Sequence, residues 1–376
     1  MEIIGYAVAA LVIFYLVWIF KLASALRNAN IDLPSAIPDI SVSIVVAMRN
    51  EQEHILNLLN ALRAQKNPPL QTELILIDDF STDNTLQQIE SWKVYNSDFN
   101  IRVIAMNDFP NAGKGKKDAI LLGINSAMHD YIITTDADCT MQANWLNTMC
   151  NYFISARPAL LAGPVMLHAD ILFGKLQQME MILLQALTCA TFKLNKPVMC
   201  NAANLMFRKM DYLSLNKNAL NAKTASGDDI FLMLALKQKG LKMDYCCHQQ
   251  CVVKTNAIND FSDFVHQRIR WASKIKLIND KDILTAGAVV MIANLLLLFF
   301  FGMAIACITP WYYFLFLFTL KLLCDVVLIN FVSQKLEMKQ VSYTVIIIFQ
   351  IIFPFYNILI AALSIFGKYK WKGRGY

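Results

Sequence analysis

Four long apolar runs lie at the two ends of this chain of 376 residues, and they limit its possible folds more than any other feature. The first run covers residues 3–20, and the others lie at about 284–307, 312–332 and 343–366. Each of the last three is long enough to cross a bilayer as a helix. The stretch of roughly 250 residues between them has ordinary mixed patterning, which is enough for one large domain. The sequence therefore predicts a membrane-anchored protein with a single soluble body.

The first apolar run predicts an uncleaved anchor rather than a signal peptide. It is preceded by Glu2 and by no basic residue, and no convincing cleavage site follows it, whereas Lys21 and Arg27 do. Basic residues collect on the cytoplasmic side of membrane helices. We therefore expect a multi-pass protein of a bacterial inner membrane, or an equivalent membrane, with its soluble body in the cytoplasm.

The last apolar run does not decide on which side of the membrane the C-terminal tail lies. Three crossings after a cytoplasmic body would leave the basic tail, residues 368–376, outside, against the positive-inside tendency. Pro354 lies in the middle of the run, so residues 343–366 could form a re-entrant or kinked pair that returns to the cytoplasm. We favour a cytoplasmic tail. Lys321 and Asp325, four residues apart within the preceding run, are expected to pair on a face turned toward protein.

The chain has nine cysteines and no Cys-x-x-Cys pair. Cys246, Cys247, His248 and Cys251 are close enough to raise the question of zinc, but residues 243–253 have the pattern of a strand, which sends adjacent side chains to opposite faces. Reduced, buried thiols are therefore expected. The net charge of +6 is mild, and the basic residues are not interleaved with aromatic ones, so nucleic acid is not indicated. The basic clusters at 267–276 and 368–374 suit anionic lipid head groups better.

The body alternates strands with helices. Buried strands are predicted at 40–48, 72–77, 101–106 and 131–135, with helices after the first three. This order is typical of an α/β fold with a mostly parallel sheet.

Polar residues follow each predicted strand, where ligands bind to sheets of this kind. They are Arg49 and Asn50, Asp78 and Asp79, Lys114 to Lys117, and Asp136 with Asp138. Because Asp136 and Asp138 are two apart, their carboxylates leave the strand side by side and repel each other unless a cation lies between them. A hard divalent cation with oxygen ligands would serve, although a turn or a helix N-cap also explains the pattern. Neither a dinucleotide fingerprint nor a Walker loop is present, so the rim predicts a phosphate-bearing ligand with a metal.

These residues resemble the motifs of the family 2 glycosyltransferases, which have the GT-A fold. The likeness lies in Ala47–Glu51 (an Ala-Arg-Asn-Glu-like turn with a Met inserted), in Asp78–Thr85, in the Gly-Lys-Gly-Lys loop at 113–116, and in Asp136–Asp138. The resemblance implies a GT-A nucleotide-sugar-binding domain with a mostly parallel sheet, flanked by one N-terminal and about three C-terminal membrane helices.

The second half carries three further segments that resemble this family, which extends the likeness over roughly 41–275. Residues 201–209 are similar to its Gly-x-Asn-x-x-Phe-Arg segment, with Ala203 in place of the glycine. Residues 226–229 resemble the motif that provides the catalytic base, although a helix N-terminus would also explain them. Residues 267–271 match the Gln-x-x-Arg-Trp motif of membrane members and are also typical of an interfacial helix.

The resemblance implies a role for each matching residue. Asp229, with Asp228 beside it, would be catalytic, and Asp138 with Asp136 would hold Mg²⁺ or Mn²⁺. Asn201 and Asn204 would lie on the acceptor side. The donor would be bound by Ala47, Arg49, Glu51, Asp79, Lys114, Lys117, Asp136, Gln267, Arg270 and Trp271.

The function implied is inverting transfer of a sugar from a nucleotide-diphosphate sugar, a UDP-sugar first of all, to a hydroxyl group of a membrane lipid. The motif arrangement and the ending Trp371-Lys372-Gly373-Arg374 are similar to ceramide and carotenoid glucosyltransferases. An apolar helix expected at 171–193 could lie at the membrane interface. The alternatives are a polysaccharide synthase, for which four apolar spans make a poor conduit, and a non-catalytic membrane scaffold or lipid carrier that retains the fold.

The expected organisation follows from these assignments. It consists of an anchor (1–24), a linker (25–40), a GT-A catalytic domain (41–255), an interfacial helix with the Gln-x-x-Arg-Trp motif (256–282), C-terminal membrane helices (283–367) and a basic tail (368–376).

Overall fold

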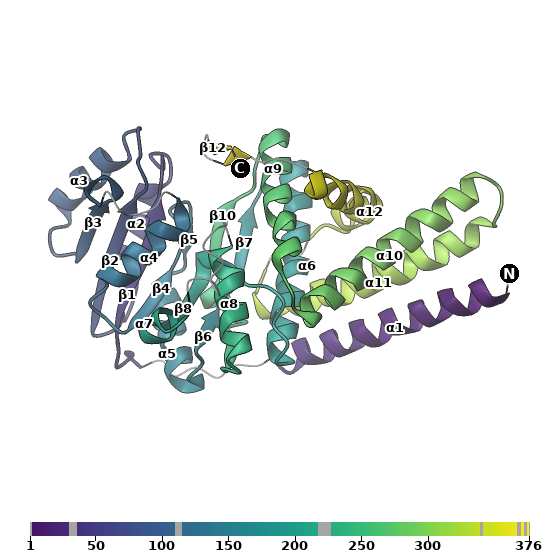
Figure 1. Ribbon diagram of the computed structural model, residues 1–376, viewed down its shortest axis with the longest axis horizontal. Coiled ribbons are helices and arrows are strands. Elements are labelled where there is room, and N and C mark those ends of the chain that lie inside the picture. Colours follow the sequence, from purple (N-terminus) through teal and green to yellow (C-terminus); the bar gives the residue numbers. More distant parts are fainter. Residues whose placement is uncertain are drawn as a thin grey trace.

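The computed structural model describes residues 2–29, 36–109, 115–216, 227–338, 341–366, 370–371 and 374–375. A sheet of seven strands in the order β3-β2-β1-β4-β8-β6-β9 forms the centre of the body (Figure 1). Only β8 runs antiparallel to its two neighbours, so the sheet is mostly parallel as predicted. In that order the strands are Ile101–Ala105, Gln71–Asp78, Ser41–Met48, Tyr131–Thr134, Leu205–Arg208, Leu160–Ala162 and Met243–Tyr245.

Helices cover both faces of this sheet. Alternate residues of β1 point to opposite faces, so Val42, Ile44 and Val46 pack in one apolar core while Val45 packs in the other. The first core is closed by α2 (Ile55–Arg63), α3 (Thr85–Tyr95) and α5 (Trp145–Ala156). The second is closed by α4 (Lys116–Ser126), α6 (Leu172–Lys193), α7 (Lys209–Leu213) and α8 (Asp228–Gln238). Burial on both faces explains the continuous apolar strands seen in the sequence.

A second sheet of three strands lies beside the carboxyl end of β4. Its order is β5 (Thr140–Met141), β10 (Val253–Asn256) and β7 (Val165–His168). Short 3₁₀ turns complete the body at Met106–Asp108, Ala202–Asn204, Gln249–Cys251 and Ser273–Leu277. Because β10 comes from far along the chain, this small sheet brings late residues next to Asp138.

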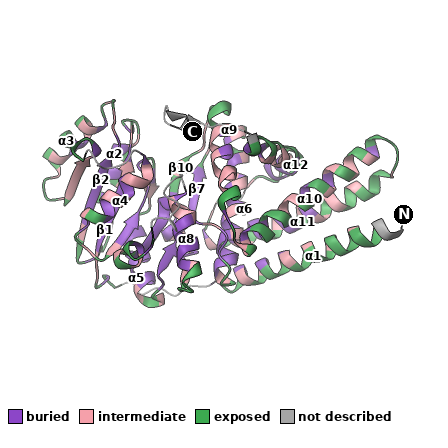
Figure 2. Ribbon diagram, viewed as in Figure 1, coloured by how far each residue is buried: buried purple, intermediate pink, exposed green. Residues whose placement is uncertain are grey.

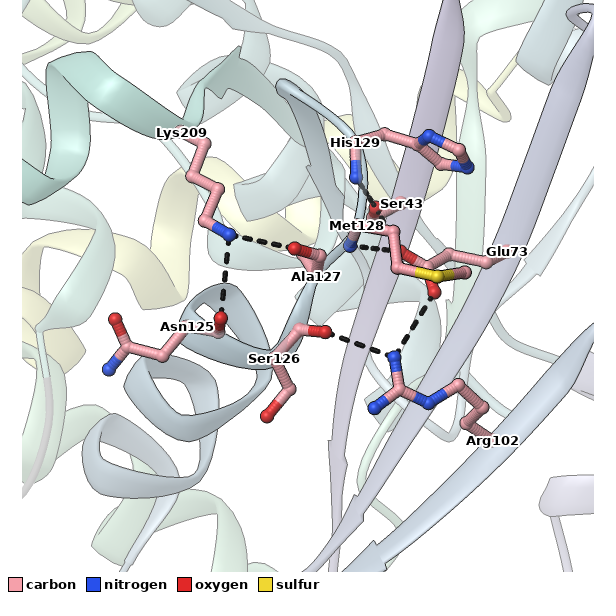
Figure 3. Close-up of polar contacts among 9 residues, drawn as sticks. All are labelled: Ser43, Glu73, Arg102, Asn125, Ser126, Ala127, Met128, His129 and Lys209. Atoms are coloured by element: carbon pink, nitrogen blue, oxygen red, sulfur yellow. Dashed lines mark hydrogen bonds and ion pairs between the residues drawn. The ribbon is translucent and has the colours of Figure 1, made fainter.

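The amino ends of the central strands are joined by a buried polar network around Glu73 (Figure 3). The carboxylate of Glu73, which is wholly buried, accepts hydrogen bonds from the Ser43 hydroxyl and from the Met128 N–H (2.6 Å). Arg102 Nη1 lies 3.5 Å from its other oxygen and also donates to the Ser126 carbonyl. This network fixes the loop after α4 at the edge of the sheet opposite the ligand-binding edge.

Four helices are long and apolar enough to cross a membrane: α1 (Glu2–Arg27), α10 (Lys281–Ile305), α11 (Trp311–Lys335) and α12 (Tyr343–Phe366). In Figure 1, α1, α10 and α11 extend side by side away from the body, whereas α12 is seen nearly end-on beside α6 and α9 (Phe261–Ala272). Helix α12 is continuous through Pro354, so residues 343–366 do not form the re-entrant pair that the sequence left open. Figure 2 shows exposed residues along the outer surfaces of these helices, as expected of surfaces in contact with lipid.

The cysteines of the body differ from the prediction in one pair. Strand β9 ends at Tyr245, and the turn at Gln249–Cys251 folds the chain back, so that Cys246 and Cys251 form a disulfide instead of remaining thiols. Cys247 is a buried free thiol, as expected. Within the described part of the chain, no group of three or more His, Cys, Asp or Glu side chains could hold a metal.

Candidate active site

A cavity of about 1100 Å³ lies beyond the carboxyl ends of β1, β2 and β4 and extends to the membrane helices. Its polar end is lined by most of the residues predicted from the rim motifs. These are Ala47, Arg49, Glu51, Asp79, Asp136, Asp138, Asn201, Asp228, Asp229, Gln267, Arg270 and Trp271. The fold therefore brings together in one place segments that are more than 200 residues apart in sequence.

The ends of β1 and β2 are locked together at the start of this cavity. Arg49 Nη1 donates to the carbonyl oxygens of Asp79 (2.7 Å) and Phe80 (3.0 Å). Asn50 and Phe80 adopt left-handed backbone angles, with φ of 52° and 60°, which tightens both turns. Asp79 is buried and accepts a hydrogen bond from the Gly115 N–H at 3.2 Å. These contacts make a rigid wall with a carboxylate aimed at the cavity.

Asp136 is paired with a lysine that the sequence analysis did not single out. Lys116, the first residue of α4, places its Nζ 2.6 Å from Asp136 Oδ1. Burial lowers the pKa of Lys116, but Asp136, Asp228 and Asp229 outweigh that effect and raise it above its ordinary value. Lys116 therefore stays charged, and one carboxylate of the Asp-x-Asp pair is neutralised by the chain itself.

The two lysines that were predicted to bind the donor are placed differently. Lys114 lies outside the described residues. Lys117 is not part of the cavity wall, because its Nζ packs over the ring of Phe231 at 4.9 Å from the centroid. Burial there lowers the pKa of Lys117 to about 8. Of the two described lysines in this segment, Lys116 lines the cavity and Lys117 does not.

Asp138 is the carboxylate of the pair that faces the open cavity. It is exposed, and its Oδ2 accepts a hydrogen bond from Thr255 Oγ1 of β10 at 2.9 Å. Carboxylate and hydroxyl oxygens are the donors that Mg²⁺ and Mn²⁺ prefer, and such ions are commonly held by one or two carboxylates together with substrate phosphates and water. Asp138 and Asp136 therefore fit a divalent ion that is completed by its substrate.

Asp229 is held at the start of α8 by two backbone donors. Its Oδ1 accepts from the Ile230 N–H (2.7 Å) and its Oδ2 from the Ala202 N–H (3.3 Å), and Lys274 Nζ lies 4.0 Å from Oδ1. Burial alone raises the pKa of Asp229, but Lys274, these N–H groups and Lys116 together hold it below its ordinary value. The side chain is therefore a carboxylate at neutral pH.

Its neighbour Asp228 has the opposite electrostatic environment. Burial, aided by the charge of Asp229, raises the pKa of Asp228 above that of an ordinary aspartate, although Lys116 and Lys274 oppose the rise. Gly227, with φ of 93°, precedes the pair as the helix N-cap and turns both carboxylates into the cavity.

The two predicted acceptor-side asparagines differ in placement. Asn201 lines the cavity, and its Oδ1 accepts from the Ala203 N–H at 3.1 Å. Asn204 is fully buried and is not part of the cavity wall. Its amide donates to the carbonyls of Pro164 and Cys251, and its Oδ1 accepts from Trp145 Nε1. Since every polar atom of this side chain is used inside the protein, Asn204 joins the two sheets instead of contacting a ligand, which corrects its predicted role.

The Gln-x-x-Arg-Trp motif lies on α9, with Gln267, Arg270 and Trp271 at the cavity wall. Between them, Arg268 is buried and was missed by the sequence analysis. Its guanidinium donates to Glu180 Oε2 of α6 through Nε (3.0 Å) and Nη2 (2.7 Å), and it lies over the rings of Phe264 and Trp271. This ion pair fixes α9 against α6. In the sequence, Arg268 was marked only by being a charged residue in a helix that was expected at the membrane interface.

The other end of the cavity is largely apolar. Met181 and Leu184 of α6, Ile283 of α10 and Ile360 of α12 line it, with Asn357 of α12 among them. The cavity thus changes from a charged site at the sheet to a hydrophobic space bounded by α6, α10 and α12.

Comparisons with known proteins agree with this geometry. A family model described as "Glycosyl transferase family 2" matches residues 43–213. The chain is 35% identical over 98 residues to an undecaprenyl-phosphate 4-deoxy-4-formamido-L-arabinose transferase of Proteus mirabilis, covering 26% of this chain and 28% of that protein. It is 28% identical over 142 residues to a poly-beta-1,6-N-acetyl-D-glucosamine synthase of Staphylococcus epidermidis, covering 37% of this chain and 32% of that protein. The match therefore spans about a third or less of the length of these relatives.

A solved structure shares the fold. The mannosyltransferase PcManGT from Pyrobaculum calidifontis, determined in complex with GDP-Man and Mn²⁺, superposes with a TM-score of 0.50 at 15% identity, covering 87% of this chain and 98% of that one. Together with the family match and the sheet order, this similarity confirms the predicted GT-A fold.

Proposed function

From the match of residues 43–213 to the model of glycosyl transferase family 2, we propose that the protein is an inverting glycosyltransferase that glycosylates a hydroxyl group of a membrane lipid. The donor is a nucleotide-diphosphate sugar, a UDP-sugar first of all. One observation carries the proposal: a single cavity joins the acidic site at the sheet to an apolar space bounded by α6, α10 and α12. A site that must hold both a charged donor and a lipid needs these two surroundings within reach of each other.

The donor would lie along the rim of the sheet. Asp79, which accepts a hydrogen bond from the Gly115 N–H and whose carbonyl accepts one from Arg49, would bind the nucleobase. Asp136 would bind the ribose or belong to the coordination shell of the metal. Mg²⁺ or Mn²⁺ would be held by Asp138, with Asp136 near it, and would offset the negative charge that grows on the departing diphosphate. The Lys116 ammonium supports the same charge from the protein side.

The transfer step uses Asp229 as the general base. The acceptor oxygen attacks the anomeric carbon as its proton passes to the Asp229 carboxylate, and the bond from that carbon to the diphosphate oxygen breaks, its electron pair leaving with the diphosphate. Attack opposite the leaving group inverts the configuration. The lowered pKa of Asp229 supports this role, because the group is deprotonated and ready to accept a proton at neutral pH.

The acceptor group is a neutral hydroxyl rather than a phosphate. Asp229 is a carboxylate at neutral pH, so it is ready to take the proton that a hydroxyl acceptor must lose. A phosphate acceptor would need no general base. This distinguishes the present site from the function that the name of the Proteus relative implies.

The same proposal assigns the parts of the chain. Residues 41–255 are the catalytic domain, residues 256–282 the interfacial segment and residues 283–367 the membrane helices, with the catalytic body in the cytoplasm. The second candidate function is synthesis of a polysaccharide, which the relationship to the Staphylococcus synthase supports.

The full chain purified in detergent tests the proposal. It is incubated with radiolabelled nucleotide sugars, Mg²⁺ or Mn²⁺ and a total membrane lipid extract. We expect hydrolysis of one donor without lipid and label in an organic-soluble product with lipid. Label in a long water-soluble chain would favour the polysaccharide synthase, and no turnover of any donor would favour a non-catalytic scaffold.

A further inference from the structure

We infer that α12 does not cross the membrane but lies along its surface. We further infer that an acyl lipid enters the cavity from the bilayer by passing this helix. Hydropathy alone places α12 among the helices able to span a bilayer. Its direction differs, however, because α1, α10 and α11 run side by side while α12 is seen nearly end-on (Figure 1). If the three-helix bundle crosses the bilayer, α12 lies roughly in the plane of the bilayer.

Polar contacts hold α12 against the rest of the protein at two points. Gln350 bonds to Lys321 and Asp325 of α11, whose own ion pair measures 2.7 Å. Six residues later, the Tyr356 hydroxyl lies 3.2 Å from Glu180 Oε1 of α6, and its ring stacks on Phe264 of α9. Polar side chains of apolar helices commonly hydrogen-bond to neighbouring helices, which fixes how those helices pack. The two contacts therefore fix α12 across the base of the body.

The opposite side of α12 is suited to hydrocarbon. The helix contains no charged residue. Its outward stripe repeats every four residues and is substantially exposed: Ile347, Ile351, Phe355, Leu359 and Leu363. A continuous apolar stripe of this kind on a protein surface indicates contact with lipid. Since the described part of α12 offers no basic residue for head groups, we assign the stripe to the acyl chains of the bilayer.

The inner side of the same helix belongs to the cavity. Tyr356, Asn357 and Ile360 line it, opposite Leu184 of α6. Within the described parts of the chain, the buried Oδ1 of Asn357 accepts no hydrogen bond. A buried acceptor without a partner is costly, and the hydroxyl of an incoming lipid would satisfy it. One face of α12 thus contacts acyl chains while the other leads toward Asp229.

This placement also settles the side of the tail. The N-terminus lies at the far end of the bundle, whereas strand β11 (Lys370–Trp371), paired with β12 (Arg374–Gly375), lies against α9 (Figure 1). Lys276 donates to the carbonyl of Ile365 at 2.6 Å, which ties the end of α12 to the body. The body end of the bundle carries Arg27 and Lys335, while the far turn at 306–310 carries no charge. If α1, α10 and α11 are the three crossings, the body and the tail lie on the same side of the membrane, the cytoplasmic side, where basic residues collect.

Depth measurements test the orientation of α12. Nitroxide labels are attached one at a time at Ile347→Cys, Ile351→Cys, Phe355→Cys and Leu359→Cys of the full chain in a Cys307→Ser background, because Cys307 is exposed. The chain is placed in phosphatidylcholine vesicles, and the depth of each label is read from oxygen and nickel accessibility. A helix in the plane gives four similar depths. A crossing helix would shift successive labels by about 6 Å, and that result would overturn the inference.

Thiol labelling tests the tail, because Cys307 is an exposed native probe in the far turn. A membrane-impermeant maleimide should reach Cys307 from one side of sealed vesicles. In a Cys307→Ser background, it should reach Gly375→Cys and the body probe Asp98→Cys from the other. Labelling of Gly375→Cys from the side of Cys307 would contradict three crossings.

The entry route rests on the proposed function, and a photoreactive lipid tests it separately. Phosphatidylcholine vesicles containing diacylglycerol with a diazirine acyl chain should label Leu184 and Ile360 as well as the outer stripe. Asn357→Phe should reduce the label on Leu184 several-fold and leave Ile351 unchanged. Label on the stripe alone would overturn the route, whereas correct labelling without any donor hydrolysis would overturn the proposed function and leave the route standing.

Discussion

Lys116 Nζ lies 2.6 Å from Asp136 Oδ1, so one carboxylate of the Asp-x-Asp pair already has a cation from the protein. Asp138, two residues later, is exposed to the cavity with a hydroxyl donor from Thr255. The pair is therefore asymmetric: the first carboxylate is neutralised by the fold, and the second is available to a divalent ion.

Asp138→Asn should consequently remove most of the metal dependence. We expect weaker Mn²⁺ binding by electron paramagnetic resonance titration and a fall in transfer of about 10²-fold or more, the size typical of losing one charge-stabilising contact in a transition state. Asp170→Asn, at an exposed carboxylate that pairs with His168, is the control and should bind Mn²⁺ normally. Full turnover by enzyme stripped with EDTA would exclude a metal role for Asp138.

Lys117 should make stability depend on pH in the alkaline range. Burial lowers its pKa in the folded protein from 10.5 to about 8. Between these values the unfolded chain binds more protons than the folded one, so stability should rise as pH increases from about 8 to 10.5. Lys117→Met should flatten this rise in thermal melts recorded across the range, whereas Lys93→Met, on the exposed face of α3, should not. A slope that survives Lys117→Met would show that another group is responsible.

The network around Glu73 should be needed for folding but not for chemistry, since it lies at the amino ends of the strands (Figure 3). Glu73→Ala leaves the Ser43 hydroxyl and the Met128 N–H buried without their acceptor. We expect a loss on the order of 3 kcal/mol of unfolding free energy and a melting temperature lower by roughly 6–12 °C. Below the new transition, donor affinity should be unchanged. Glu90→Gln, which removes a surface ion pair with Lys93, should melt like the wild type.

The sequence was sufficient for the four parallel strands β1, β2, β3 and β4 and for the acids of the rim, because buried parallel strands are continuous apolar runs whose ends are marked by polar residues. It could not choose among Lys114, Lys116 and Lys117, which are nearly consecutive. Between the two described lysines, the choice depends on Gly115, whose φ of 115° starts α4 so that Lys116 reaches Asp136.

Two other differences between the sequence prediction and the structure depend on contacts with residues far away in the sequence. Asn204 is kept from the cavity by Trp145 and by the Cys251 carbonyl, neither of which a local motif reveals. Helix α12 has the composition of a membrane-spanning helix, and hydropathy alone does not predict how a helix is oriented relative to the membrane. Its orientation follows from where Gln350 and Tyr356 find partners.

The central claim is that Asp229 removes a proton from a lipid hydroxyl while other residues hold the donor. Its most direct test compares Asp229→Asn with the wild type by two measurements, mass spectrometry of the lipid product and calorimetric titration with the nucleotide sugar. The account predicts that the variant binds the donor within a few-fold of the wild type and forms no glycolipid, while the wild type adds a single sugar with inverted configuration. Normal glycolipid formation by Asp229→Asn, or loss of donor binding together with activity, would contradict it.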